Sequence, residues 1–174
     1  MNSLAAARPR LWPRRAREAL VTAHIMISVG LLGDSAGFLA VAIRAYTAED
    51  PATATTHVEV LKMFSQVFGI PLSFGSLLTG IALGLGTKWG VFRYPWVVLK
   101  LALVVSVMAV GGLMIGPSQT AWLTGTHDAR WQLIVAGAYD VVALGLATAL
   151  SVFKPGLPFR RQTSGLAAGT PRAE

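Results

Sequence analysis

Long apolar runs separated by short polar stretches dominate the hydrophobic pattern of this chain. A helix needs about 20 apolar residues to cross roughly 30 Å of hydrocarbon. The runs that are long enough predict membrane spans over about Ala19–Tyr46, Val58–Leu85, Trp96–Ile115 and Trp131–Phe153. The pattern therefore predicts an all-α protein whose residues 19–155 form a four-transmembrane-helix bundle.

The segments outside the bundle have a different composition. Residues 1–18 are rich in arginine, whereas residues 156–174 are rich in Gly, Pro, Ser and Thr and hold few large apolar side chains. Such a tail buries too little surface to offset its conformational entropy, so we predict that it is disordered.

Basic residues gather on one side of the predicted bundle. Arginines precede the first span, Lys154 follows the last, and the middle connection carries Lys88 and Arg93. Cytoplasmic flanks and loops carry an excess of Lys and Arg, so both termini and this connection are predicted to be cytoplasmic. The connections over residues 45–57 and 116–130 would then lie outside, in a multi-pass protein of the plasma (inner) membrane.

Composition supports a membrane protein and excludes several other classes. The chain is 53% hydrophobic and 13% charged, whereas a soluble domain carries roughly 25% charged residues. The net charge of +7 suits an anionic lipid surface better than nucleic acid, because no base-stacking aromatic platform accompanies the arginines. The absence of cysteine excludes disulfides and thiolate chemistry. We expect the lipid bilayer as partner, and no nucleic acid.

Two basic side chains lie inside the spans near their cytoplasmic ends. His24 is about 7 Å into the first span, and Lys100 is about 6 Å into the third. The stem of Lys100 can carry its ammonium back to the headgroups, and His24 can serve as a packing residue. Alternatively, if these two helices pack together, both side chains share one polar pocket.

Small and polar side chains form a stripe along the second span. At 100° per residue, they fall within about 40° of one line. The stripe consists of Lys62, Gln66, Gly69, Ser73, Ser76, Gly80 and Gly84. It predicts a seam for close helix packing, with a polar pathway as the alternative. Pro71, on the opposite face, predicts a bend.

Two carboxylates lie deep in the predicted spans. Asp140 is about 15 Å into the fourth span, and Asp34 lies at middle to outer depth in the first. Because charge is costly in the bilayer core, both are predicted to face the bundle interior, with Lys62 as the counter-charge of Asp34. With Gln66, these residues form a candidate buried polar pair or pathway. Gly33 and Gly37 have the spacing of a close helix contact beside Asp34.

A second candidate site lies near the outer surface. Its members are His57, Glu59, His127 and Asp128. Imidazole and carboxylate groups together can hold zinc or copper(II). The alternative is that they are solvated residues at helix ends, where Asp128 suits the start of the fourth helix.

Three short stretches resemble small bacterial integral membrane proteins of unknown function. They are HIMISVGLLG from His24, PWVVLKL from Pro95, and the segment from Pro71 to Gly90. Over residues 19–155 the layout is more distantly similar to the copper-resistance D membrane family and the J-type protoporphyrinogen oxidases. The resemblance implies haem b or another porphyrin as cofactor, with His24 as axial ligand and Lys100 as partner of a propionate.

Three functions remain open at this point. The sequence favours a non-enzymatic accessory to transport or envelope processes. The alternatives are a haem- or porphyrin-binding redox protein that uses His24 and Lys100, and a proton or metal permease component that uses Asp34, Lys62 and Asp140. Because four helices form a narrow bundle, we expect transport to require a homo-oligomer or a membrane-protein partner.

Overall fold

The structure is a computed structural model that describes residues 13–86, 94–124 and 130–153. Its helices, in chain order, are α1 (Arg14–Thr47), α2 (Pro51–Phe64), η1 (Ser65–Gly69), α3 (Ile70–Gly86), α4 (Pro95–Val110), η2 (Gly111–Ile115), α5 (Gly116–Leu123) and α6 (Arg130–Phe153). The elements η1 and η2 are π-helical turns within longer rods. Within the described residues, 4 helices are long and apolar enough to cross a membrane. The predicted all-α class and the predicted number of apolar helices are therefore confirmed.

Two predicted connections are shorter than expected, and this corrects the span boundaries. The second rod begins at Pro51 rather than Val58, because Asp50 caps it and Pro51 suits the first helical turn. The carboxylate of Asp50 accepts hydrogen bonds from the hydroxyl of Thr53 at 2.7 Å and from its backbone N–H at 2.9 Å. These bonds, the hydroxyl first, lower the pKa of Asp50. The third rod continues beyond Ile115 through α5, so residues 116–123 are helical rather than part of a loop.

Each π-helical turn is followed by a proline at the same offset. Pro71 follows η1 and Pro117 follows η2, in each case two positions after the last π-helical residue. A proline has no N–H and its ring clashes with the carbonyl four residues earlier, so widening the preceding turn relieves the conflict. The wider turns are closed by bonds from the N–H of Ile70 to the carbonyl of Ser65 and from Gly116 to Gly111.

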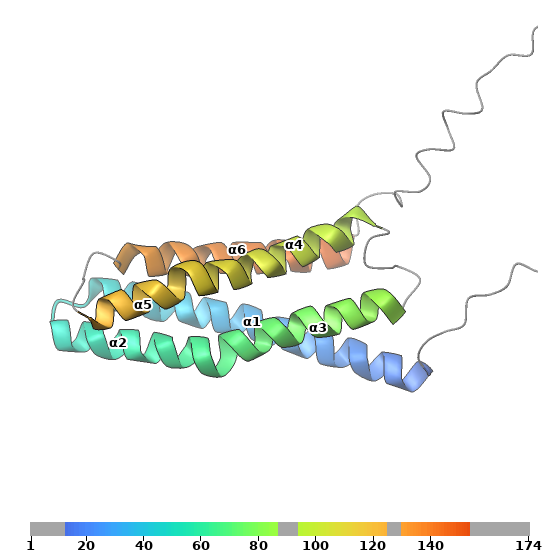
Figure 1. The fold of residues 1–174 in the computed structure, drawn as a ribbon, viewed down its shortest axis with the longest axis horizontal. Helices are drawn as coiled ribbons and strands as arrows, with labels where there is room; N and C mark the ends of the chain where they lie inside the picture. Colours follow the sequence, from blue (N-terminus) through green and yellow to red (C-terminus); the bar gives the residue numbers. More distant parts are fainter. Residues whose placement is uncertain (1–12, 87–93, 125–129, 154–174) are drawn as a thin grey trace, which may run out of the picture.

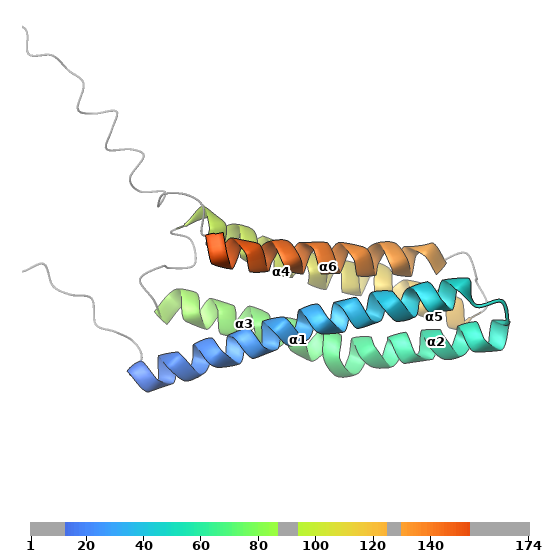
Figure 2. The same cartoon turned by 180° about the vertical axis from the view of Figure 1, so that it is seen from behind.

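The rods form one elongated bundle. α1 packs against α2, α3 and α6, and α4 packs against α6. Figures 1 and 2 show that α1 begins and α6 ends at the same end of the bundle. The second rod bends where α2 passes into α3 (Figure 1), at η1, as Pro71 predicted. Large apolar side chains cover the outside, including Met26, which is 70% exposed. That surface suits lipid tails.

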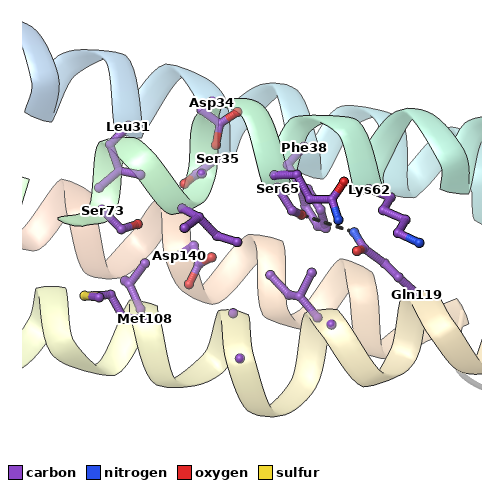
Figure 3. A pocket seen from close by; sticks show the side chains of 18 of the residues that line it. Leu31, Asp34, Ser35, Phe38, Lys62, Ser65, Ser73, Met108, Gln119 and Asp140 are labelled. Atoms are coloured by element: carbon purple, nitrogen blue, oxygen red, sulfur yellow. Dashed lines mark hydrogen bonds between the residues drawn. The ribbon is translucent and has the colours of Figure 1, made fainter. Parts of the chain in front are cut away.

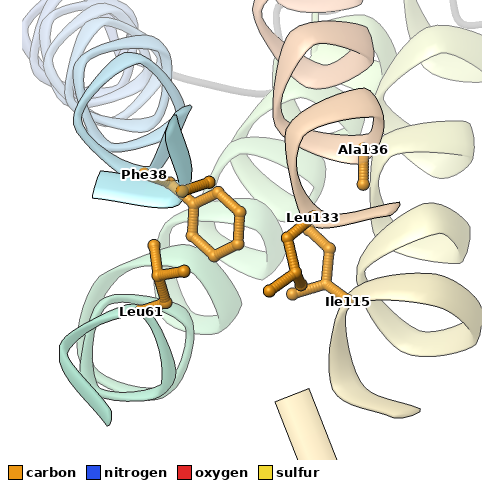
Figure 4. Packing of buried hydrophobic residues seen from close by; sticks show 6 residues of the cluster. Phe38, Leu61, Ile115, Leu133 and Ala136 are labelled. Atoms are coloured by element: carbon orange, nitrogen blue, oxygen red, sulfur yellow. The ribbon is translucent and has the colours of Figure 1, made fainter. Parts of the chain in front are cut away.

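Two apolar clusters fill the bundle at different heights. One contains Phe38, Leu61, Ile115, Leu133 and Ala136 (Figure 4). The other contains Leu31, Val107, Ala143 and Leu144. The buried face of α6 runs through both clusters at helical spacing, and Asp140 lies on that face between Ala136 and Ala143. The fold therefore places a carboxylate between two apolar layers.

Candidate intramembrane carboxylate site

A cavity of about 560 Å³, partly open at the surface of the bundle, is lined by the two deep carboxylates. Its lining draws on α1, on both halves of the second and third rods, on η1 and η2, and on α6. Figure 3 shows Asp34 and Asp140 reaching this cavity from α1 and α6. Its wall is largely apolar, with Leu31, Phe38 and Val107 among the lining residues. This geometry agrees with the prediction that both aspartates face the bundle interior.

Asp34 stands where α1 meets the second rod. Its Oδ1 atom is buried and has no hydrogen-bond partner within the described part of the chain. A Cβ atom placed on Gly69 of η1 would lie 3.3 Å from Asp34 Oδ2. Glycine at that position therefore leaves room for the carboxylate at the cavity wall.

Asp140 is the more deeply buried of the two carboxylates. The residue is 8% exposed, and its Oδ1 atom is buried with no hydrogen-bond partner among the described residues. Asp34 lies close enough for the two negative charges to interact. Because a buried polar atom without a partner is costly, this pair of carboxyl groups favours a bound positive charge or a shared proton.

The predicted ion pair between Asp34 and Lys62 is not formed. Lys62 lines the cavity but is exposed, and Figure 3 shows its ammonium directed away from Asp34. Gln66 also lines the cavity and is exposed. The extra residue in the π-helical turn η1 shifts the helical phase of α3, so Lys62 and Gln66 are exposed while Ser73 and Ser76 of the same predicted stripe are buried.

The part of the predicted stripe that lies in α3 is a packing seam between α3 and α1. Ser73, Ser76 and Gly84 are buried, and the hydroxyl of Ser76 shares a 3.3 Å hydrogen bond with Ser28 of α1. A Cβ atom on Gly80 would lie 3.3 Å from His24 Cε1. Small residues on α3 thus allow the close helix approach that the sequence predicted.

The predicted glycine pair beside Asp34 behaves differently at its two members. A Cβ atom on Gly37 would lie 3.2 Å from Phe64 Cε1, whereas one on Gly33 would meet nothing within 4 Å. Gly33 is therefore not part of a close contact, and the glycine that approaches Asp34 is Gly69 of η1. The sequence prediction of a two-glycine contact is wrong at Gly33.

A polar contact that the sequence did not predict joins α5 to η1 at the cavity wall. The amide of Gln119 in α5 donates a 3.2 Å hydrogen bond to the hydroxyl of Ser65 in η1, and both residues line the cavity. Gln119 is buried. The sequence pattern predicts a connection over residues 116–130, whereas Gln119 lies in α5, two residues after a proline that resembles Pro71 in its position.

His24 is held by the second rod rather than by Lys100. Its Nδ1 atom lies 2.8 Å from the hydroxyl of Thr79, which itself donates to the carbonyl of Gly75 at 2.6 Å. The single hydroxyl proton of Thr79 is thus used, so Nδ1 carries the hydrogen and donates, and Nε2 is left as an acceptor.

Lys100 is hydrogen-bonded to α6. Its ammonium donates a 2.6 Å hydrogen bond to the hydroxyl of Ser151 and lies 6.0 Å from the ring centroid of Trp96. The charges of His24 and Lys100 are close enough to interact, but hydrogen bonds direct the two side chains to different helices. They do not line the carboxylate cavity.

This geometry gives little room for a haem at His24. The imidazole lies against the backbone of α3 at Gly80 and is engaged by Thr79. Methionine can also ligate haem, but Met108 lines the carboxylate cavity, which His24 does not. The assignment of His24 and Lys100 to a porphyrin therefore stays a prediction that the described contacts do not support.

The candidate outer metal site is described only in part. His57 and Glu59 lie within α2, where His57 Nδ1 is 2.7 Å from the carbonyl of Thr53 and Glu59 is exposed. His127 and Asp128 lie outside the described residues. Across the ranges that the structure describes, no group of three His, Cys, Asp or Glu side chains is placed to hold a metal ion.

Comparisons of this chain with protein-family models, with curated proteins and with solved structures yield no match.

Proposed function

We propose that this chain is a non-enzymatic membrane protein that binds a proton or another cation between Asp34 and Asp140 and acts as a permease component. The observation that carries the proposal is the unpaired Oδ1 atom of Asp140 in a residue that is 8% exposed. Asp34 lines the same cavity and also has an unpaired buried oxygen within the described residues. Two carboxylates in a low-dielectric interior need a positive charge or a shared proton.

The cost of this arrangement is the reason to assign it a function. An unpaired buried polar group costs about 1–3 kcal/mol, and a structural role would be served better by apolar residues such as those in the clusters above and below. An accessory protein without a site of its own gives no account of both aspartates. Two π-helical turns border the same cavity, and such turns are frequent at functional sites because they replace regular helix contacts.

Transport also requires access from both sides and an orientation in the membrane. We propose that both termini face the cytoplasm at the plasma membrane. Arg14, Arg15 and Arg17 open α1 at one end of the bundle, whereas Glu49 and Asp50 lie at the other, and cytoplasmic flanks favour basic residues. A second copy, or a membrane-protein partner, is expected to complete the pathway.

Flux into vesicles tests the proposed function. Purified protein is reconstituted into lipid vesicles that enclose a pH-sensitive dye, and a pH gradient or a membrane potential is imposed. We expect proton movement above that of empty vesicles, and its loss in Asp34→Asn and Asp140→Asn. Glu49→Gln is the matched control, because it removes an exposed carboxylate between α1 and α2 that does not line the cavity.

Flux that is equal in the parent protein and both cavity variants would reject the proposal. Orientation is tested separately with a cysteine introduced at Glu49, since the chain has no cysteine of its own. Labelling of that cysteine by an impermeant maleimide added to intact cells is expected, and protection from the reagent would contradict the orientation.

A further inference from the structure

The carboxylate cavity is much larger than one small ion requires. Its volume is about 560 Å³, whereas a water molecule occupies about 30 Å³ in the liquid. Pockets for small organic molecules span about 300–1,000 Å³. The cavity therefore has the size of an organic ligand site rather than of a single-ion site.

The lining is complementary to a ligand that joins an apolar body to a positive charge. Apolar and aromatic side chains line most of the wall, among them Ile70, Phe74 and Met108. Negative charge comes from Asp34 and Asp140. Aromatic rings and carboxylates that line one cavity suit an organic cation, because a ring face attracts positive charge while the apolar surface favours a hydrocarbon body.

The described residues argue against a divalent metal as the main occupant. They contain no group of three His, Cys, Asp or Glu side chains that would hold one. A hard divalent cation takes six or more oxygen ligands or retains its waters, and an apolar wall offers neither. A bulky ammonium has diffuse charge and needs no such ligand shell.

Depth separates a free organic cation from the headgroup of a lipid. Asp140 lies about 15 Å along α6 from Arg130 at helical rise. The hydrocarbon core is about 30 Å thick, so this depth is near its middle if the start of α6 is at the surface. A lipid ammonium remains at the headgroup level and does not reach that depth.

From the joint placement of the apolar wall and the carboxylates, we infer that the cavity binds a monovalent organic cation with an apolar body, in exchange for protons. The inference rests on the proposed function and specifies the substrate class of the same site. The titratable groups that line the cavity are Asp34, Asp140 and Lys62. Binding is therefore stronger when both carboxylates are ionised, and entry of the cation releases protons from them.

Protection from a hydrophobic carbodiimide tests the inference. This reagent modifies protonated carboxyl groups in apolar surroundings, and mass spectrometry locates the adduct. In detergent-solubilised full-length protein we expect modification of Asp140 or Asp34. Benzyltriethylammonium should slow it about tenfold or more, as a charge-assisted contact implies. A neutral benzyl compound of similar size should not protect.

Two variants and a proton measurement make the test independent of folding defects. Phe74→Leu should weaken protection by the ammonium about threefold to tenfold, by loss of the ring contact, while labelling without ligand stays unchanged. Glu49→Gln, at an exposed carboxylate that does not line the cavity, should behave as the parent. Addition of benzyltriethylammonium to weakly buffered parent protein should release protons.

The outcomes separate the inference from the proposed function. If sodium, potassium or magnesium protects and benzyltriethylammonium does not, the organic-cation inference is overturned while the cation site stands. If the carboxyls are labelled and none of these cations protects, the inference is overturned as well. If neither aspartate is labelled at any pH, and proton flux is also absent, both the inference and the proposed function fail.

Discussion

Asp34 and Asp140 lie on different helices, yet both residues line one cavity, and each has a buried Oδ1 atom without a hydrogen-bond partner in the described part of the chain. Lys62 lines the same cavity without pairing with either residue. The relationship is therefore between two negative groups, not between opposite charges. Two buried carboxylates without a counter-charge lower the stability of the bundle, whereas the packing of its helices raises it.

Removal of Asp140 is expected to stabilise the protein. Asp140→Leu eliminates an unpaired buried carboxylate and should raise the free energy of unfolding by about 1–3 kcal/mol, while proton flux is lost. Unfolding in mixed detergent micelles, followed by circular dichroism, measures this change. Gln119→Leu is the control, since it removes a buried side chain that does have a partner, Ser65, and should lower stability. Destabilisation by Asp140→Leu would mean that the carboxylate is a paired structural group.

Two glycines of α6 are expected to respond in opposite directions to the same substitution. A Cβ atom on Gly137 would lie 3.2 Å from Phe38 Cδ1 and 3.4 Å from Leu39 Cα. The backbone of α1 cannot give way readily, so Gly137→Ala should cost about 1–3 kcal/mol. Gly145 meets nothing within 4 Å, so Gly145→Ala should gain about 0.5–1 kcal/mol from lower chain entropy. The same unfolding assay compares them, and equal effects would contradict the packing of α1 on α6.

The start of α2 is expected to depend on pH through Asp50. Bonds from Thr53 lower the pKa of Asp50 in the folded protein, so the ionised form is favoured by folding. The stabilisation is complete above the ordinary aspartate pKa and is lost as the pH falls through the lowered value. Protection of the Thr53 amide from hydrogen exchange should fall at acid pH. Asp50→Asn keeps a capping oxygen and should lose this pH dependence; if the variant retains it, another group is responsible.

Pro117 is expected to maintain the wide turn at η2. Pro117→Ala restores an N–H that can bond the carbonyl of Leu113, so the turn can return to α-helical geometry and rotate α5. Cysteines introduced at Ser65 and Gln119, whose side chains are in hydrogen-bond contact, should be joined by a short bis-methanethiosulfonate crosslinker in the parent. Crosslinking should drop sharply with Pro117→Ala. Pro95→Ala, at the first turn of α4, is the control, and equal crosslinking in all three proteins would contradict the role of Pro117.

The apolar runs predicted the helices because hydropathy over a bilayer thickness is a strong signal. They did not predict where the helices end, because a capped turn at Asp50 and a polar but helical α5 are both low in hydropathy. The inward direction of Asp140 was predictable from the cost of charge in lipid, and it agrees with the position of this residue between Ala136 and Ala143 on the buried face.

The sequence did not predict which faces of the second and third rods are buried, because a constant rotation of 100° per residue does not allow for a π-helical turn. One additional residue in a π-helical turn rotates everything beyond it, so Lys62 and Gln66 do not share the buried face of Ser73 and Ser76, although a uniform helix placed all four on one line. Pro71 indicated a bend but not a widened turn. Pro117 carried the same information about η2, and it was missed because the surrounding residues had been interpreted as a loop.

The central claim is that Asp34 and Asp140 make this cavity selective for positive charge, and the reaction of a cysteine at Ser73 tests it most directly. Ser73 is a buried residue of the cavity wall, and the parent chain has no cysteine. We predict that Ser73→Cys reacts much faster with a cationic methanethiosulfonate than with an anionic one. The preference should be lost when Asp34 and Asp140 are both replaced by asparagine. Equal rates with both reagents in the protein that retains its aspartates, or a preference that survives their replacement, would contradict the account.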